Sequence, residues 1–340
     1  MTPLVGVYGL AAGVIIGAAG HVIIQFAALV RRGLRLRPTL SRQTEGLAEV
    51  ARLMGPRIAS QAVSQANLIV MTNFASRLGE GRLSALNYAQ HLVMLPHGVL
   101  ALSLSTVIFP LMARQYELRR LDELKQTLHR ALGTLVFLSI PAAVGLFAFR
   151  VSIVQVAFQY GSFTPRSTAL VAEAVGYFAL GLLARAVVEP VTRAFYAMHD
   201  TRTPLSVSIL TVVANIALSW WLAPRLGHGG LALSISITNT IRMFILLAIL
   251  SRRTGGLGQG LVLSLLRMLP AVVNLALVSF WLAEPLRHMT DPTDGRTIWA
   301  YGLFTFSLAS AGAAYLVAAF YLGVPECKQL LRTVQRRLVR

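Results

Sequence analysis

The sequence has few charged residues, very few carboxylates and a single cysteine. Only 13% of its 340 residues are charged and 55% are hydrophobic, whereas soluble domains carry about a quarter charged residues. This composition excludes a soluble enzyme. The lone Cys327 excludes an internal disulfide framework and a cysteine-based metal site. ATP-binding, HExxH and nucleophile-elbow patterns are also missing, so we expect no enzymatic activity, no cofactor and no metal.

What the chain does contain is nine apolar segments, separated by glycine, proline and charge. A membrane-spanning helix needs about 20 apolar residues, and each segment is long enough. They cover roughly 4–30, 52–77, 84–112, 131–158, 167–198, 204–223, 229–250, 262–283 and 298–323. We therefore predict an all-α polytopic membrane protein with about nine transmembrane helices.

The basic residues predict which side of the membrane each loop faces. One alternate set of loops holds eighteen basic residues and the other set holds five. The larger set is Arg31, Arg32, Arg35, Arg37, Arg42, Arg114, Arg119, Arg120, Lys125, Arg130, Arg202, Arg252, Arg253, Lys328, Arg332, Arg336, Arg337 and Arg340. We expect the protein in the inner (plasma) membrane. The positive-inside rule places its N-terminus outside and its C-terminus in the cytoplasm.

The net charge of +18 is therefore mainly a topology signal. Attraction to anionic inner-leaflet lipid is a secondary effect, and we expect no nucleic-acid partner. An odd number of crossings that starts outside is unusual, and it suggests that the chain lacks segments at its front.

Several short motifs, in order and spacing, resemble one family. They include Ser84-Ala85-Leu86-Asn87-Tyr88-Ala89, Gly161-Ser162-Phe163-Thr164, the run from Arg193 to Pro204, and Gly227-His228-Gly229-Gly230. Together they resemble the MurJ (MviN) lipid II flippases of the MOP superfamily, most specifically over residues 50–250. Members of this family have fourteen helices: two six-helix lobes around a central cavity, then two helices that form a groove for a polyprenyl tail.

The resemblance implies that this chain supplies the sixth to fourteenth helices and lacks the first five. Residues 1–30 would be the last helix of an incomplete N-lobe, and 31–50 a basic cytoplasmic linker. A six-helix C-lobe would follow at 51–251, two groove helices at 261–323, and a basic cytoplasmic tail at 324–340. A separate N-lobe chain is then a possible partner.

Polar residues in the second segment predict a wetted helix face. Arg57, Gln61, Gln65 and Thr72 recur at helical spacing, and such a stripe is costly against lipid. Asn67 and Asn73 add further amides. The stripe lines either a substrate cavity or a polar seam between helices, and the resemblance favours the cavity.

Two departures from the family pattern weaken the expected site. Gln90-His91 lies where the family has a variable or acidic residue followed by an essential arginine, and Met71 replaces a usual aspartate. Histidine loses its charge near pH 6.5, whereas arginine keeps it. His91 is either a weaker substrate contact or a packed polar side chain.

Arg185, Glu189 and Arg193 follow one another at four-residue steps, so they share a helix face. They form either a structural ion triad or, through the surplus positive charge, a site that attracts an anionic headgroup. Arg185 is the triad member that we include in the predicted substrate-binding set, with Arg57, Gln61, Gln65, Asn67, Asn73, Gln90 and His91.

The leading hypothesis is an alternating-access transporter of the undecaprenyl-linked peptidoglycan precursor, lipid II, in cell-wall biosynthesis. A second hypothesis is a degenerate paralogue that acts as a non-transporting membrane scaffold. A third is an exporter of another lipid-linked oligosaccharide.

We predict that single cysteines at positions 36 and 122 are protected from an impermeant thiol reagent in intact cells, and that one at position 292 reacts. The eighteen-to-five charge bias is the reason. The measurement uses a variant without Cys327. The opposite labelling pattern would invert the topology.

Overall fold

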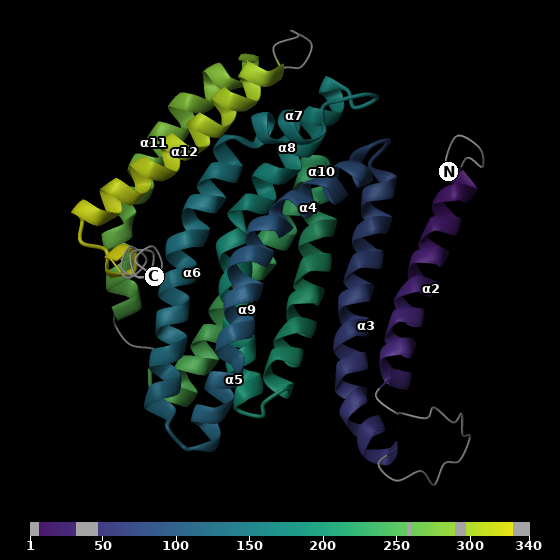
Figure 1. Ribbon diagram of the computed structural model, residues 1–340, viewed down its shortest axis with the longest axis vertical. Helices are drawn as coiled ribbons and strands as arrows, with labels where there is room; N and C mark the ends of the chain where they lie inside the picture. Colours follow the sequence, from purple (N-terminus) through teal and green to yellow (C-terminus); the bar gives the residue numbers. More distant parts are fainter. Residues whose placement is uncertain (1–6, 32–46, 257–259, 290–296, 329–340) are drawn as a thin grey trace. The chain divides into compact units, whose positions relative to one another are not determined.

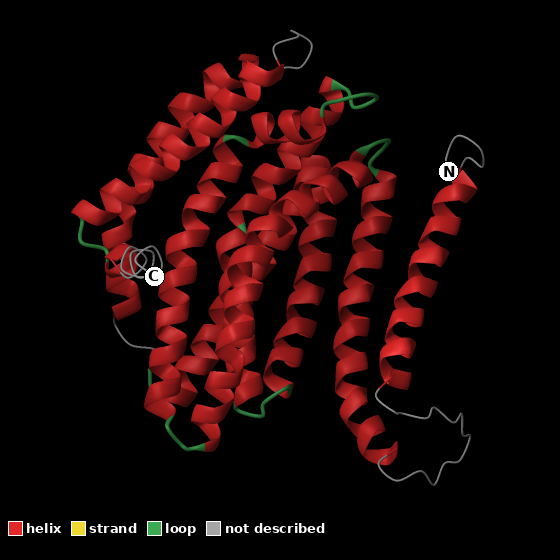
Figure 2. Cartoon of the chain, viewed as in Figure 1, coloured by secondary structure: helices red, strands yellow, loops and turns green. Residues whose placement is uncertain are grey.

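The computed structural model describes residues 7–31, 47–256, 260–289 and 297–328, and every element in these ranges is a helix (Figures 1 and 2). The helices are α2 (Val7–Arg31), α3 (Leu47–Arg77), α4 (Arg82–His97), the π-helix η1 (Gly98–Leu102), α5 (Ser103–Glu117), α6 (Leu121–Ala148), α7 (Arg150–Phe158), α8 (Pro165–Leu180), α9 (Leu182–Ala197), α10 (Arg202–Thr254), α11 (Gly260–Met289) and α12 (Thr297–Tyr321). Within these ranges, six helices are long and apolar enough to span a membrane, and the bent pair α8–α9 makes a seventh. The prediction of an all-α polytopic membrane protein is confirmed.

The chain forms two units, residues 1–55 and 56–340. In the first unit, α2 is apolar, and its spanning stretch from Ala11 to Arg31 has no buried residues. Residues 32–46 of the predicted linker and 329–340 of the predicted tail lie outside the described residues. The division into a six-helix lobe and two groove helices stays a prediction.

The core of the second unit lies between α6, α9 and the later part of α10. Leu132, Phe195 and Leu246 are fully buried in one hydrophobic cluster. The pair α11–α12 packs beside α6 (Figure 1). Tyr315 on α12 donates a hydrogen bond of 3.0 Å to the carbonyl of Phe137 on α6, which satisfies its hydroxyl inside an apolar contact.

Helix α10 is a hairpin of two antiparallel arms. Its 53 residues contain one non-helical position, Gly227 (φ 58°, ψ −138°), a left-handed φ that glycine adopts without strain. A hydrogen bond joins the two arms: the Asn215 amide on the first arm donates to the Thr238 hydroxyl on the second at 3.3 Å. The predicted spans 204–223 and 229–250 are therefore separate arms of α10, each long enough to cross the membrane.

Two predicted spans differ from the structure. The expected span 131–158 is wrong, because α6 starts earlier and ends at Ala148. Phe149 leaves the helical conformation (φ −92°, ψ 13°), and Arg150 bonds back to the Phe147 carbonyl at 2.6 Å. The expected span 167–198 is bent by 48° between α8 and α9, where Gly181 lies against Ser236.

Contacts between turns define two ends of the second unit. At one end, Arg253 forms an ion pair with Asp200, and the α5–α6 and α9–α10 turns carry basic residues. Burial alone would raise the pKa of the Asp200 carboxyl, but hydrogen bonds from Thr203 and Arg253 outweigh it and hold that pKa below its usual value. At the other end, Arg82 lies against Gly227 and Gly81 against Leu170. Under the predicted topology, the first end is cytoplasmic and the second is outside.

We predict that Gly230→Ala lowers the thermal stability of the detergent-solubilised chain. A Cβ at this position would lie 2.5 Å from the carbonyl oxygen of Leu222 on the facing arm, and overpacking of this kind costs about 1–3 kcal/mol. Gly312→Ala on α12 is the matched control, because its Cβ would meet nothing within 4 Å. Thermal melts followed by circular dichroism check this. Equal midpoints for the two variants would contradict the close approach of the arms.

Candidate functional site

One face of α3 presents polar side chains away from the packed core. Gln61, Gln65 and Thr72 are exposed, whereas Met71 and Phe74 on another face are half-buried against the core. Helix α3 is not among the helices apolar enough to span a membrane on composition alone. Exposed amides on a helix at membrane depth require water or a polar partner, so this face suits a wet cavity.

The remaining predicted residues differ from one another in exposure. Asn73 is exposed, while Asn67, Gln90 and Arg185 are half-buried; the Asn67 amide oxygen is buried without a partner among the described residues. Nothing is described for the side chain of Arg57. No hydrogen bond or ion pair joins two of the predicted residues whose side chains are described.

His91 on α4 is exposed, and its ring is fixed by the helix that carries it. Its Nδ1 lies 2.7 Å from the carbonyl oxygen of Asn87. A carbonyl only accepts, so Nδ1 must carry the proton. In the neutral ring, Nε2 is then an unprotonated acceptor, and a phosphate oxygen gains a donor there only from the imidazolium form.

A second cluster surrounds Glu189 on α9. The carboxylate lies 3.7 Å from Nε2 of His97 on α4 and interacts electrostatically with Arg193 and with Arg242 on α10. Arg185 also interacts electrostatically with the Glu189 carboxylate. The predicted triad is therefore incomplete: the nearest basic group to Glu189 comes from another helix, and sequence spacing along α9 could not reveal His97 or Arg242.

Three members of this cluster, Glu189, Arg193 and Arg242, border a cavity of about 350 Å³ between α5, α9 and α10. Its lining includes Glu189, Thr192, Arg193, Tyr196 and Arg242. The Thr192 hydroxyl and the Arg242 Nε are buried without a hydrogen-bond partner in the described part of the chain. With one carboxylate against two arginines in its lining, the cavity carries surplus positive charge and suits an anionic group.

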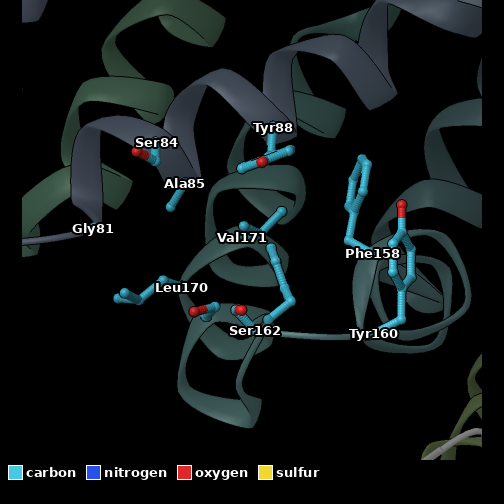
Figure 3. A pocket seen from close by; sticks show the side chains of 11 residues that line it. Gly81, Ser84, Ala85, Tyr88, Phe158, Tyr160, Ser162, Leu170 and Val171 are labelled. Carbon is cyan, nitrogen blue, oxygen red and sulfur yellow. The ribbon is translucent and has the colours of Figure 1, made fainter. Parts of the chain in front are cut away.

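A separate pocket of about 470 Å³ lies at the opposite end, between α4, the turn after α7, and α8 (Figure 3). Tyr88, Phe158, Tyr160 and Ser162 line it together with Ser84. Rings and hydroxyls predominate, and none of the residues that line it is charged. Within the described residues, no group of three or more His, Cys, Asp or Glu could hold a metal ion.

Comparison with known proteins identifies a family. Residues 2–291 match the family model described as lipid II flippase MurJ. The chain is 30% identical to a probable lipid II flippase MurJ of Rhizobium meliloti (strain 1021) over 97% of its own length and 61% of the relative. It is 29% identical to a lipid II flippase MurJ of Burkholderia cenocepacia over 93% of its length and 63% of that relative. The chain thus spans about three fifths of these relatives.

Solved structures share the fold. A lipid II flippase MurJ in an inward closed conformation superposes with a TM-score of 0.70 at 22% identity, over 100% of this chain and 64% of the other. An outward-facing multidrug resistance MATE family transporter of the MOP superfamily gives a TM-score of 0.52 at 15% identity, over 82% of this chain and 66% of the other.

We predict that His91→Arg strengthens binding of UDP-glucose, a soluble pyrophosphate diester. An arginine presents a permanently charged fork of N–H donors, whereas one ring nitrogen of His91 is already bonded to the Asn87 carbonyl. A charge-assisted hydrogen bond contributes about 1.5–3 kcal/mol, or roughly tenfold or more in affinity.

Isothermal titration of the chain in lipid nanodiscs gives the measurement. His199→Arg is the control, since His199 is exposed at the opposite helix end, in the α9–α10 turn. Equal affinities for wild type and both variants would place His91 outside the anion site.

Proposed function

The chain belongs to the lipid II flippase MurJ family, and on that premise we propose that it forms the second lobe and the tail groove of a lipid flippase. Its substrate is the undecaprenyl-linked peptidoglycan precursor, which it moves from the inner to the outer leaflet by alternating access. The protein is a transporter in the inner membrane and catalyses no covalent step. The observation that carries the proposal is the exposed polar face of α3, with Gln61 and Gln65, together with the exposure of His91 on α4.

The physical barrier explains why such a face is needed. A disaccharide-pyrophosphate headgroup cannot cross about 30 Å of hydrocarbon unaided. A polar face on membrane-crossing helices, enclosed by the first lobe, would replace the water that the headgroup loses. The predicted residues Gln61, Gln65, Asn67, Asn73 and Gln90 would supply amides to the headgroup, and His91 an imidazole.

The tail of the substrate requires a different surface. Helices α11 and α12 pair with one another and expose large apolar side chains, among them Leu277, Trp281 and Phe306. An apolar surface of this kind suits a polyprenyl chain, which gains nothing from a polar cavity. The proposed transporter thus separates headgroup and tail between the lobe and the groove.

The cationic cavity at Arg193 and Arg242 supports loading from the cytoplasmic leaflet. Its surplus charge attracts the substrate phosphates and anionic inner-leaflet lipid. Arg185 lies one turn of α9 before Glu189 and adds to the local positive charge. We assign this cavity to capture of the headgroup and the polar face to its passage.

This assignment also requires a first lobe, since the chain spans about three fifths of its relatives. That lobe would supply the other half of the cavity wall, because the exposed face of α3 is only one side of an enclosure. Both termini would follow the predicted topology, with the N-terminus outside and the C-terminus in the cytoplasm.

A non-transporting scaffold is the second candidate, favoured by one observation. One ring nitrogen of His91 is already bonded to the Asn87 carbonyl, so the headgroup contact at this position is weaker than that of an arginine fork. An exporter of a different lipid-linked oligosaccharide would use the same polar face and the same cationic cavity. A cation exporter is less suited, because Glu173 and Glu189 both lie near basic groups, at 3.8 Å from His228 and 3.7 Å from His97.

We predict that this chain alone does not restore growth to cells depleted of their lipid II flippase. Co-expression with the part of the Rhizobium meliloti relative that this chain does not cover should restore it, because the two parts would enclose the headgroup. Growth on depletion, with membrane levels of each chain measured by immunoblot, checks this outcome.

The matched variant is Gln61→Leu with Gln65→Leu, which removes two exposed amides from α3, and Thr305→Leu on α12 is the control. We expect the first to reduce rescue and the second to leave it unchanged. Rescue by the chain alone would contradict the need for a first-lobe partner, and equal rescue by both variants would favour a site elsewhere.

A further inference from the structure

Two motifs that are far apart in the sequence converge in the pocket of Figure 3. Ser84, Ala85 and Tyr88 come from the start of α4, and Ser162 and Phe163 come from the turn before α8. The proposed headgroup contacts, Gln61 and Gln65 on α3 and His91 on α4, are not among the residues that line this pocket. A pocket of about 470 Å³ falls within the range of small-molecule sites.

The lining chemistry restricts what the pocket can bind. Its residues are Gly81, Ser84, Ala85, Tyr88, Phe158, Tyr160, Ser162, Phe163, Ser167, Leu170 and Val171, with no charged side chain. A phosphate or a carboxylate would therefore lose its hydration without gaining a counter-charge. A purely aliphatic chain would leave the hydroxyls unpaired. The pocket suits a ligand that is neutral, hydroxylated and partly apolar.

The aromatic and polar groups are arranged in two sets. Tyr88, Phe158 and Phe163 form one packed group, with ring centroids 4.9 Å apart for Tyr88–Phe158 and 5.8 Å apart for Tyr88–Phe163. Tyr160 extends from the turn with 73% of its surface exposed. The hydroxyls of Ser84 and Ser162 make no hydrogen bond to any described residue, so their hydrogen-bonding capacity is available to a ligand.

We propose that this pocket binds the saccharide part of a glycolipid, with a pyranose ring against Tyr160 and Tyr88 and its hydroxyls bonded to Ser84 and Ser162. Sugar rings combine an apolar C–H face, which packs on aromatic rings, with a rim of hydroxyl and amide groups. The glycolipid is identified through the proposed flippase function. Because Gly81 and Leu170 mark the end opposite the basic turns, the pocket would hold the sugar on the outer side of the membrane.

Titration of di-N-acetylchitobiose, a soluble neutral disaccharide, tests the proposal on the full chain in phosphatidylcholine nanodiscs without maltoside detergent. We expect saturable binding that Tyr160→Ala weakens roughly three- to tenfold and that Tyr160→Phe preserves. Ser84→Ala should weaken it as well. Tyr321→Ala is the control, because Tyr321 is 83% exposed on α12 and outside the pocket. Inorganic phosphate should neither bind there nor compete.

Equal affinities for wild type, Tyr160→Ala and Ser84→Ala would overturn the saccharide site, as would displacement of chitobiose by octanoate, which would indicate an acyl-chain pocket. Circular dichroism melts establish that Tyr160→Ala is folded, as its exposure leads us to expect. The growth rescue described above separates the two proposals. Rescue without chitobiose binding rejects the pocket alone, whereas binding without rescue rejects the flippase assignment and leaves the pocket as a saccharide site.

Discussion

The described part of the lobe depends on one carboxylate, Glu189, to hold basic side chains inside a membrane protein. His97 reaches it from α4, Arg242 from α10, and Arg193 from its own helix. Uncompensated cations at membrane depth are costly, so this carboxylate offsets part of the charge of Arg193 and Arg242 and gives His97 a partner. The compensation is incomplete, so the cavity lined by Arg193 and Arg242 keeps a surplus positive charge.

Charged, polar and apolar surfaces lie in different parts of the bundle. The cationic cavity lies between α5, α9 and α10, the amide face lies on α3, and the neutral aromatic pocket lies at the other end. In the proposed transporter each would serve a different part of a glycolipid: the phosphates, the headgroup in passage, and the sugar. The apolar surface of α11 and α12 would serve the hydrocarbon tail.

Fold class and most helix positions could be predicted from the sequence because apolar length dominates in a membrane. The polar stripe on α3 was also predictable from spacing alone, since Gln61, Gln65 and Thr72 share one helix face. The approach of His97 and Arg242 to Glu189 was not, because contacts between helices depend on packing. The break at Phe149 was missed for a related reason, since an apolar aromatic residue gives no stop signal in a hydropathy pattern.

The orientation of the His91 ring likewise needed the structure, because the bond to the Asn87 carbonyl decides which ring nitrogen faces outward. The π-helix η1 has a further consequence. Gly98–Leu102 follows Pro96 within a continuous helical stretch from α4 to α5, and a π-turn accommodates one more residue than an α-turn. The side chains of α5 are therefore rotated by about one residue, roughly 100°, relative to a straight continuation of α4. A single-residue deletion in η1 would turn the whole of α5, and Phe109 with it, away from the cavity that it now borders.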